Sequence, residues 1–142
     1  MTASASDFFL NFSLAAVNGP QATVISGTAD AIQAICETLA AQGIQSKKLT
    51  VSHAFHSPLM QPIRAEFERI ATEVKFTTPR ITLISNLSGG PVTEEVTHPA
   101  YWGEHIMAPV SFAQGIVALQ EQAVTHCIEI GPKAILLGMM RD

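Results

Sequence analysis

VSHAFHSPLM, residues 51–60, decides how the middle of this chain folds. The stretch ends an extended run, places His56 at a bend and then opens a helix. Ser57 is the expected N-cap, and Pro58 suits the first turn, where the missing N–H of proline costs nothing. A helix beginning there points its positive end toward His56, which disfavours an imidazolium and keeps the ring neutral, as a general base must be. A histidine near a strand end is more often structural, so the catalytic interpretation needs support from elsewhere.

Apolar periodicity on both sides of this stretch predicts alternating strands and helices. A turn at residues 18–20 separates two short β-branched runs and favours a hairpin. Apolar residues at spacings of three and four predict helices, and Gly43 is a typical helix stop. The strands expected are 13–17, 23–26, 44–51, 81–85 and 127–130; the helices expected begin at Thr28, Ser57, Phe112 and Ala134, with residues 99–109 as an irregular connector.

Such alternation indicates a layered α/β or α+β domain. The opening strand-strand-helix-strand order suits a small ferredoxin-like sheet. The strand-helix-strand-helix order after Pro79 suits part of a larger parallel sheet. We therefore expect both kinds of sheet in the chain.

Length and composition narrow the class of protein. A chain of 142 residues is one domain long. The formal net charge of −4 argues against a nucleic-acid partner. No apolar run approaches the roughly 20 residues of a membrane span, and the N-terminus lacks the basic start of a signal peptide. Cys36 and Cys127 both lie in apolar stretches, so we expect reduced core thiols in a cytoplasmic protein.

Few groups accompany His56 that would complete a catalytic or metal site. His53 and His56 form an H-x-x-H pair, but zinc needs three or four protein ligands and the other histidines are scattered, so no metal is expected. The sequence contains no Gly-x-Ser-x-Gly elbow and no phosphate-binding glycine loop. Ser88 lies in a Ser-Gly-Gly-Pro turn. A histidine base without a nucleophile has nothing to activate.

The chain nevertheless resembles the acyltransferase domain of modular polyketide synthases, relatives of the malonyl-CoA:acyl-carrier-protein transacylases of fatty-acid synthesis. The resemblance runs from about Leu14 to the end, over segments that follow the family's order. These segments are Ala15–Pro20 with Val24–Gly27, His53–Met60, Tyr101-Trp102 with Pro109–Phe112, and Glu129–Pro132.

The resemblance implies a fold and a reaction. Residues 1–12 are an unmatched, disordered start; residues 13–78 are a ferredoxin-like small subdomain; residues 79–142 are the C-terminal part of a large α/β-hydrolase-like acyltransferase core. A serine on a Gly-His-Ser-x-Gly elbow takes the malonyl group from malonyl-CoA, and the phosphopantetheine thiol of an acyl carrier protein then accepts it. No bound cofactor is implied.

The resemblance also implies site residues. His56 matches the family's catalytic histidine, and the main-chain carbonyl that orients its ring falls at Ser111. His53, Ala54 and Phe55 match the triplet that accompanies malonyl rather than methylmalonyl selection. Phe55 would fill the space that a branching methyl needs, although excluding one methyl is worth only about 1–3 kcal/mol.

The departure from the family is the absence from this sequence of the serine elbow, the oxyanion-loop glutamine and the arginine that pairs with the malonyl carboxylate. We expect a C-terminal half of the domain, inactive alone, whose partner is the N-terminal half together with neighbouring synthase domains. The alternative is a non-catalytic interaction module that contacts a carrier protein or a neighbouring synthase domain. An unrelated ferredoxin-like protein with a structural His56 is a further, weaker alternative.

Overall fold

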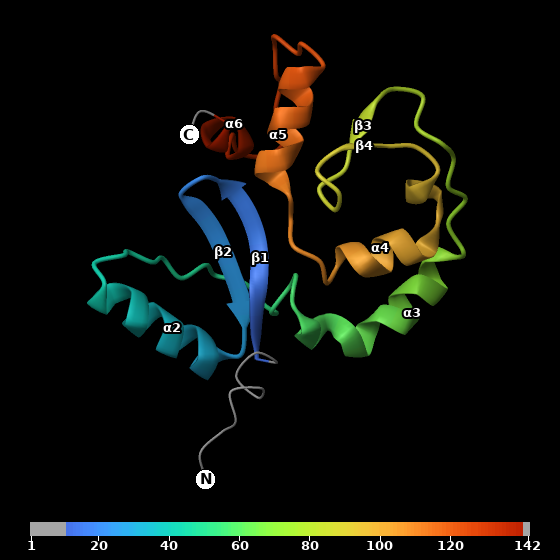
Figure 1. Cartoon of the computed structure of the whole chain (residues 1–142). Coiled ribbons are helices and arrows are strands. Elements are labelled where there is room, and N and C mark those ends of the chain that lie inside the picture. Colours follow the sequence, from blue (N-terminus) through green and yellow to red (C-terminus); the bar gives the residue numbers. More distant parts are fainter. Residues whose placement is uncertain (1–10, 141–142) are drawn as a thin grey trace.

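A β-hairpin forms the centre of the computed structural model, which describes residues 11–140 (Figure 1). Strands β1 (Phe12–Gly19) and β2 (Ala22–Gly27) pair antiparallel on either side of the expected turn. Helix α2 (Ala29–Ala41) follows, and Gly43 just beyond it has a φ of +77°, the left-handed conformation that only glycine adopts freely. The predicted hairpin and first helix are therefore confirmed.

The stretch 51–60 bends and opens a helix as the sequence predicts. A single 3₁₀ turn, η1 (Pro58–Met60), leads into α3 (Gln61–Ala71). The chain then forms a short hairpin of β3 (Leu83–Ile84) with β4 (Pro91–Val92), the 3₁₀ turn η2 (Glu95–Thr97), and the helices α4 (Pro99–His105), α5 (Phe112–Glu121) and α6 (Leu136–Met139).

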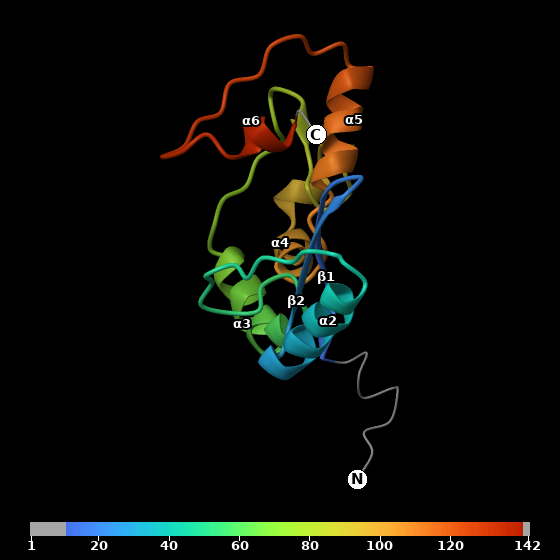
Figure 2. The same cartoon turned by 90° about the vertical axis from the view of Figure 1, so that its left-hand side faces the viewer.

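The region after Pro79 packs against β1. In both views α5 and α6 lie at one end of the molecule, and α2 and α3 lie at the other (Figures 1 and 2). The segment ahead of α5 runs alongside β1: Val110 donates its N–H to Ala15 (2.8 Å) and accepts one from Val17 (2.9 Å). Ala15 and Ala16 are buried there. This contact joins the region after Pro79 to the opening hairpin.

Helices α3 and α4 pack closely against each other. Gly103 on α4 is buried, and a Cβ at this position would overlap the carboxylate of Glu68 on α3. This packing brings the end of α4 toward the bend that precedes α3, which is how residues 50 positions apart come to share a site.

Two predicted strands do not form. Residues 44–50 and 124–130 have no regular structure, so the structure contains two-stranded sheets in place of the expected ferredoxin-like and parallel ones. A strand needs a neighbour for its N–H and C=O groups, and neither segment has one among residues 11–140. Side chains of the second segment face solvent, with Ile128 87% and Ile130 97% exposed. Cys127 is exposed as well, so its assignment as a core thiol is wrong.

Other predictions need smaller corrections. The strand expected at residues 81–85 shortens to β3. The connector expected at residues 99–109 contains α4, because Pro99 begins a helix rather than breaking one. Of the start expected to be disordered, residues 1–10 lie outside the described range, whereas Phe12 already belongs to β1. No helix between residues 11 and 140 is long and apolar enough to cross a membrane.

Candidate active site

His56 sits at the bend in a backbone conformation that few side chains adopt. Its φ is +57°, in the left-handed region, which costs on the order of 1–3 kcal/mol for a residue with a Cβ. Hydrogen bonds hold it on both sides. The His56 N–H donates to Ile106 O (2.9 Å), and the Ser13 hydroxyl donates to His56 O (2.8 Å). The bend is therefore clamped between β1 and the end of α4.

Ser57 anchors the bend from its other side. Its side chain is fully buried; the hydroxyl donates to Ala54 O (2.6 Å) and accepts from the Leu59 N–H (3.3 Å). The predicted N-cap is confirmed, although it caps the 3₁₀ turn η1 rather than α3 itself. The same hydroxyl thus closes the loop before His56 and starts the helix after it.

The imidazole of His56 is oriented by a main-chain carbonyl. Nδ1 lies 2.9 Å from Ala108 O. Because a carbonyl only accepts, this contact places the hydrogen on Nδ1 and the lone pair on Nε2. A half-buried imidazole in that tautomer has the electronic arrangement of a general base.

The assignment of this carbonyl to Ser111 is wrong by three residues. Ser111 N donates to Asn86 O (2.7 Å), and Ser111 O accepts the N–H of Gly115 (3.0 Å) as the first carbonyl of α5. The carbonyl of Ala108 is available because it precedes Pro109, where the chain leaves α4 and has not yet joined β1. The sequence predicted an irregular connector where α4 forms. It therefore did not indicate which carbonyl after this segment would lie beside the bend.

The triplet ahead of His56 forms an exposed rim. Phe55 is 44% exposed and lies edge-on to His53, with ring centroids 5.8 Å apart. His53 Nδ1 contacts the Ser52 hydroxyl (3.0 Å). Phe55 is therefore not a core aromatic among the residues that the structure describes.

A second histidine, which the sequence placed only among scattered ones, lies at the site. The rings of His105 and His56 are 6.1 Å apart between centroids, at an interplanar angle of 80°. Burial, and secondarily the nearby His56, lower the pKa of His105. His105 ends α4, one turn after Tyr101 and three residues after Trp102. The spacings of four and three residues from Tyr101 and Trp102 to His105 are helical, and they were the signal in the sequence that could have grouped His105 with the aromatic pair.

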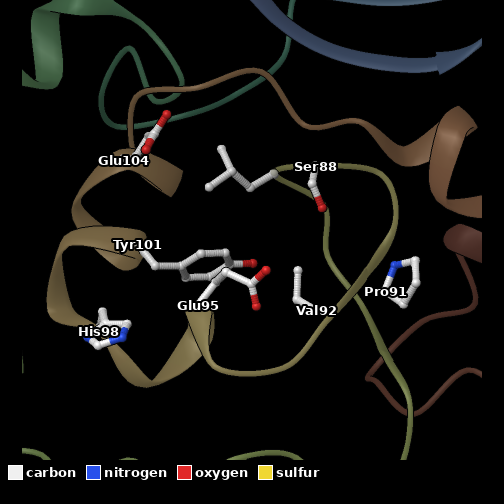
Figure 3. A pocket seen from close by; sticks show the side chains of 8 residues that line it. Ser88, Pro91, Val92, Glu95, His98, Tyr101 and Glu104 are labelled. Atoms are coloured by element: carbon white, nitrogen blue, oxygen red, sulfur yellow. The ribbon is translucent and has the colours of Figure 1, made fainter.

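A separate cavity lies between α4 and the β3–β4 hairpin. It has a volume of about 460 Å³. Tyr101 lies between its α4 side, with His98 and Glu104, and its β3–β4 side, with Ser88 and Val92 (Figure 3). The Tyr101 hydroxyl is hydrogen-bonded to Ser85 (2.5 Å). His56 does not line this cavity, and within residues 11–140 no group of three or more His, Cys, Asp or Glu side chains could hold a metal ion.

Comparison with known proteins decides the family. The family model for the acyl transferase domain matches residues 4–142. The chain belongs to the acyl transferase domain family. The match begins ahead of Leu14, so it includes most of the start that we expected to be unmatched.

Relatives of this acyl transferase sequence are polyketide synthases. It is 42% identical over 131 residues to polyketide synthase GfsB of Streptomyces halstedii, covering 91% of this chain and 2% of that protein. It is 43% identical over 129 residues to the phenolphthiocerol synthesis polyketide synthase Pks15/1 of Mycobacterium bovis, covering 91% of this chain and 6% of that protein. The chain thus spans a small fraction of the length of these relatives.

Solved acyl transferase structures share the fold described above. The acyltransferase domain from the second module of the salinomycin polyketide synthase matches with a TM-score of 0.90 at 41% identity, over 96% of this chain and 32% of that chain. The malonyl-CoA:acyl carrier protein transacylase of Xanthomonas oryzae matches with a TM-score of 0.85 at 26% identity, over 92% of this chain and 42% of that chain. The chain therefore corresponds to under half of each solved structure.

Proposed function

We propose that this chain supplies the histidine half of a malonyl-transferring acyl transferase. The reaction moves a malonyl unit from malonyl-CoA to the phosphopantetheine thiol of an acyl carrier protein. The observation that carries the proposal is the Nδ1 contact between His56 and Ala108 O, in a chain of this family. The nucleophilic serine would come from polypeptide outside the given sequence, so the chain alone would be inactive.

The proton transfers follow from the tautomer of His56. Nε2 accepts the proton of the serine hydroxyl while the serine oxygen attacks the thioester carbonyl of malonyl-CoA. The imidazolium then returns this proton to the leaving thiolate of coenzyme A, and a malonyl-serine ester remains. In the second half-reaction Nε2 takes the proton of the phosphopantetheine thiol, whose sulfur attacks the ester, and gives it back to the serine oxygen.

The clamped bend supports this role because it fixes the base before substrate arrives. A left-handed backbone at His56 is costly, and it is held by bonds from β1 and from the end of α4. Strain of this kind clusters at functional sites, where it positions reacting groups. A merely structural histidine would not need a bend secured from both sides.

Phe55 would select the extender unit. Its exposed ring lies next in sequence to the base, where a methyl branch on the malonyl carbon would collide with it. Exclusion of one methyl is worth about 1–3 kcal/mol, or roughly 10- to 200-fold in kcat/KM. His53 would act through Phe55, because it packs on the ring of that residue. Ala54 would act through the loop, because its carbonyl accepts the Ser57 hydroxyl.

The exposed segments fit the requirement for a second half of the domain. Ile128 and Ile130 present apolar surface with no neighbouring strand within residues 11–140. Burying such side chains stabilises a complex by about 1.5–3 kcal/mol each. The serine-bearing half of a relative would cover them if the two halves reassemble.

The test is transfer of radiolabelled malonyl groups from malonyl-CoA. We expect no label on this chain alone, and label on the serine-bearing half of a related domain once this chain is added.

Phe55→Ser should raise methylmalonyl transfer relative to malonyl transfer, with Leu59→Ala, at another exposed apolar position of the same stretch, as the matched control. Label on the isolated chain would contradict the proposal. Carrier-protein binding that is unaffected by His56→Ala, without any transfer, would instead favour a non-catalytic interaction module.

A further inference from the structure

The end of α4 contacts His56 through more than the orienting carbonyl. Ile106 O accepts the backbone N–H of His56, Ala108 O accepts Nδ1, and the ring of His105 lies edge-on to the ring of His56. Three nearly consecutive residues therefore contact His56, and two of them, His105 and Ala108, contact its imidazole. Ile106 and Ala108 contact His56 through main-chain carbonyls. Of these residues, only His105 contacts it through a side chain that can change its charge.

Neighbouring aromatic rings hold His105 in place. Tyr101 stacks on it at 6.1 Å and 26°, and Trp102 lies 6.3 Å away. Trp102 is in turn fixed by its indole N–H, which donates to Val96 O (3.0 Å), and by stacking on Phe76 at 6.0 Å. The His105 ring thus contacts two aromatic rings of its own helix in addition to the ring of His56.

We propose that His105 is a positioning residue whose uncharged imidazole forms an edge-on wall against His56 and preserves the ability of His56 to accept a proton. The inference rests on the proposed function, in which His56 is the base. It adds that the two imidazoles form a coupled pair that carries a single proton during the reaction. A protonated His105 would oppose the imidazolium that His56 must form.

The separation of the rings sets the size of the coupling. Two unit charges 6.1 Å apart repel enough to change an equilibrium constant about threefold at the dielectric constant of water and about 100-fold at an effective value of 20. Burial, and secondarily the nearby His56, lower the pKa of His105 and so favour its neutral form.

Among residues 11–140, the charged groups on neighbouring elements have partners of their own. On α3, the helix packed against α4, Arg64 and Glu68 face α4 and are paired with each other at 2.7 Å. On α4 itself, Glu104 acts on Arg64, and the Tyr101 hydroxyl is bonded to Ser85. From the loop before η1, His53 contacts Ser52 and Phe55. None of these contacts gives His105 a carboxylate partner.

A pH titration of the histidine side chains by ¹⁵N NMR tests the coupling in the full chain. His56→Gln removes the neighbouring imidazole, which lowers the pKa of His105, so the variant should raise the pKa of His105. His105→Lys places a permanent positive charge near His56 and should slow malonyl transfer to the serine of the reassembled domain by up to about 100-fold, whereas His105→Phe keeps a stacked ring and should leave this rate within about twofold of wild type.

A His105 titration unchanged by His56→Gln would overturn the proposal, even if the His105→Lys variant failed to fold. Equal rates of malonyl transfer in the folded His105→Lys and His105→Phe variants would overturn it as well. Failure of the proposed function appears differently, because it would abolish malonyl transfer in the reassembled domain and leave the coupled titration intact.

Discussion

The loop around His56 and the segment at residues 124–135 contrast sharply within one small chain. In the loop, the hydroxyls of Ser13 and Ser57 and the N–H groups of His56 and Leu59 all have partners. In the segment, Ile128 and Ile130 are almost fully exposed and no strand pairing forms. Its main anchor is Glu129, which accepts the N–H groups of residues 135–137.

The contrast separates what this chain builds by itself from what it offers to a partner. The loop is closed by groups within the chain, so the geometry of the base does not depend on other polypeptide. The segment has the composition of a buried strand but no neighbour to pair with among the residues described. The chain thus combines a fully hydrogen-bonded bend at His56 with an apolar segment that pairs with no strand among residues 11–140.

The largest expected effect is on amide exchange in the segment. Adding the serine-bearing half of a related domain should slow exchange at Ile128 and Ile130 by at least about 100-fold, because amides in paired strands open only through rarer unfolding events. Hydrogen-exchange mass spectrometry can follow peptides from both regions. Amides at residues 56–60 should change by less than about fivefold and serve as the internal control; equal slowing in both regions would remove the contrast.

A smaller effect is expected from removing the buried hydroxyl of Ser57. Ser57→Ala leaves Ala54 O and the Leu59 N–H without their partner and should lower the free energy of unfolding by about 1–3 kcal/mol. Urea denaturation followed by circular dichroism measures this change. Ser52→Ala is the matched control, since Ser52 is exposed and bonded to His53 alone, and it should stay within about 0.5 kcal/mol of wild type. If both variants lose equal stability, Ser57 does not anchor the bend.

The smallest effect concerns pH and Glu129. Hydrogen bonds from the backbone N–H groups of Leu137, Ile135 and Leu136 lower the pKa of this carboxyl. A lowered folded-state pKa means that the contribution to stability is present above the ordinary glutamate pKa and is lost as the pH falls through the lowered value. The amide shifts of Leu136 and Leu137 should therefore titrate with a midpoint below that of a free glutamate. Glu129→Gln should abolish this transition. A midpoint at or above the ordinary glutamate value would show that these backbone hydrogen bonds do not stabilise the carboxylate of Glu129.

The parts of the fold that local sequence determines were predicted correctly. The hairpin follows from the turn at residues 18–20, and the helix after the bend follows from Ser57 with its apolar stripe. These elements satisfy most of their own hydrogen bonds. The segments at 44–51 and 127–130 read as strands from composition, but a strand forms only beside another, and composition does not reveal whether that neighbour is present.

The candidate site was predicted as far as its motif reaches. His56 is at the bend as expected, whereas its carbonyl partner is Ala108 instead of Ser111. Partner and base are 52 residues apart, so their pairing depends on how α3 and α4 pack, in particular on the close approach at Gly103. The contact between His105 and His56 could not be predicted for the same reason, because only the packing of α4 brings His105 to the motif.

The most direct test of the central claim compares His56→Gln with His53→Gln in the reassembled domain, by the rate at which malonyl label appears on the serine in a single turnover. Loss of a general base should slow this rate by about 10²- to 10⁴-fold for His56→Gln. His53→Gln should alter it by less than about tenfold, because His53 lies on the exposed rim and does not contact the carbonyl of Ala108. Equal rates in the two variants would contradict the assignment of His56 as the base.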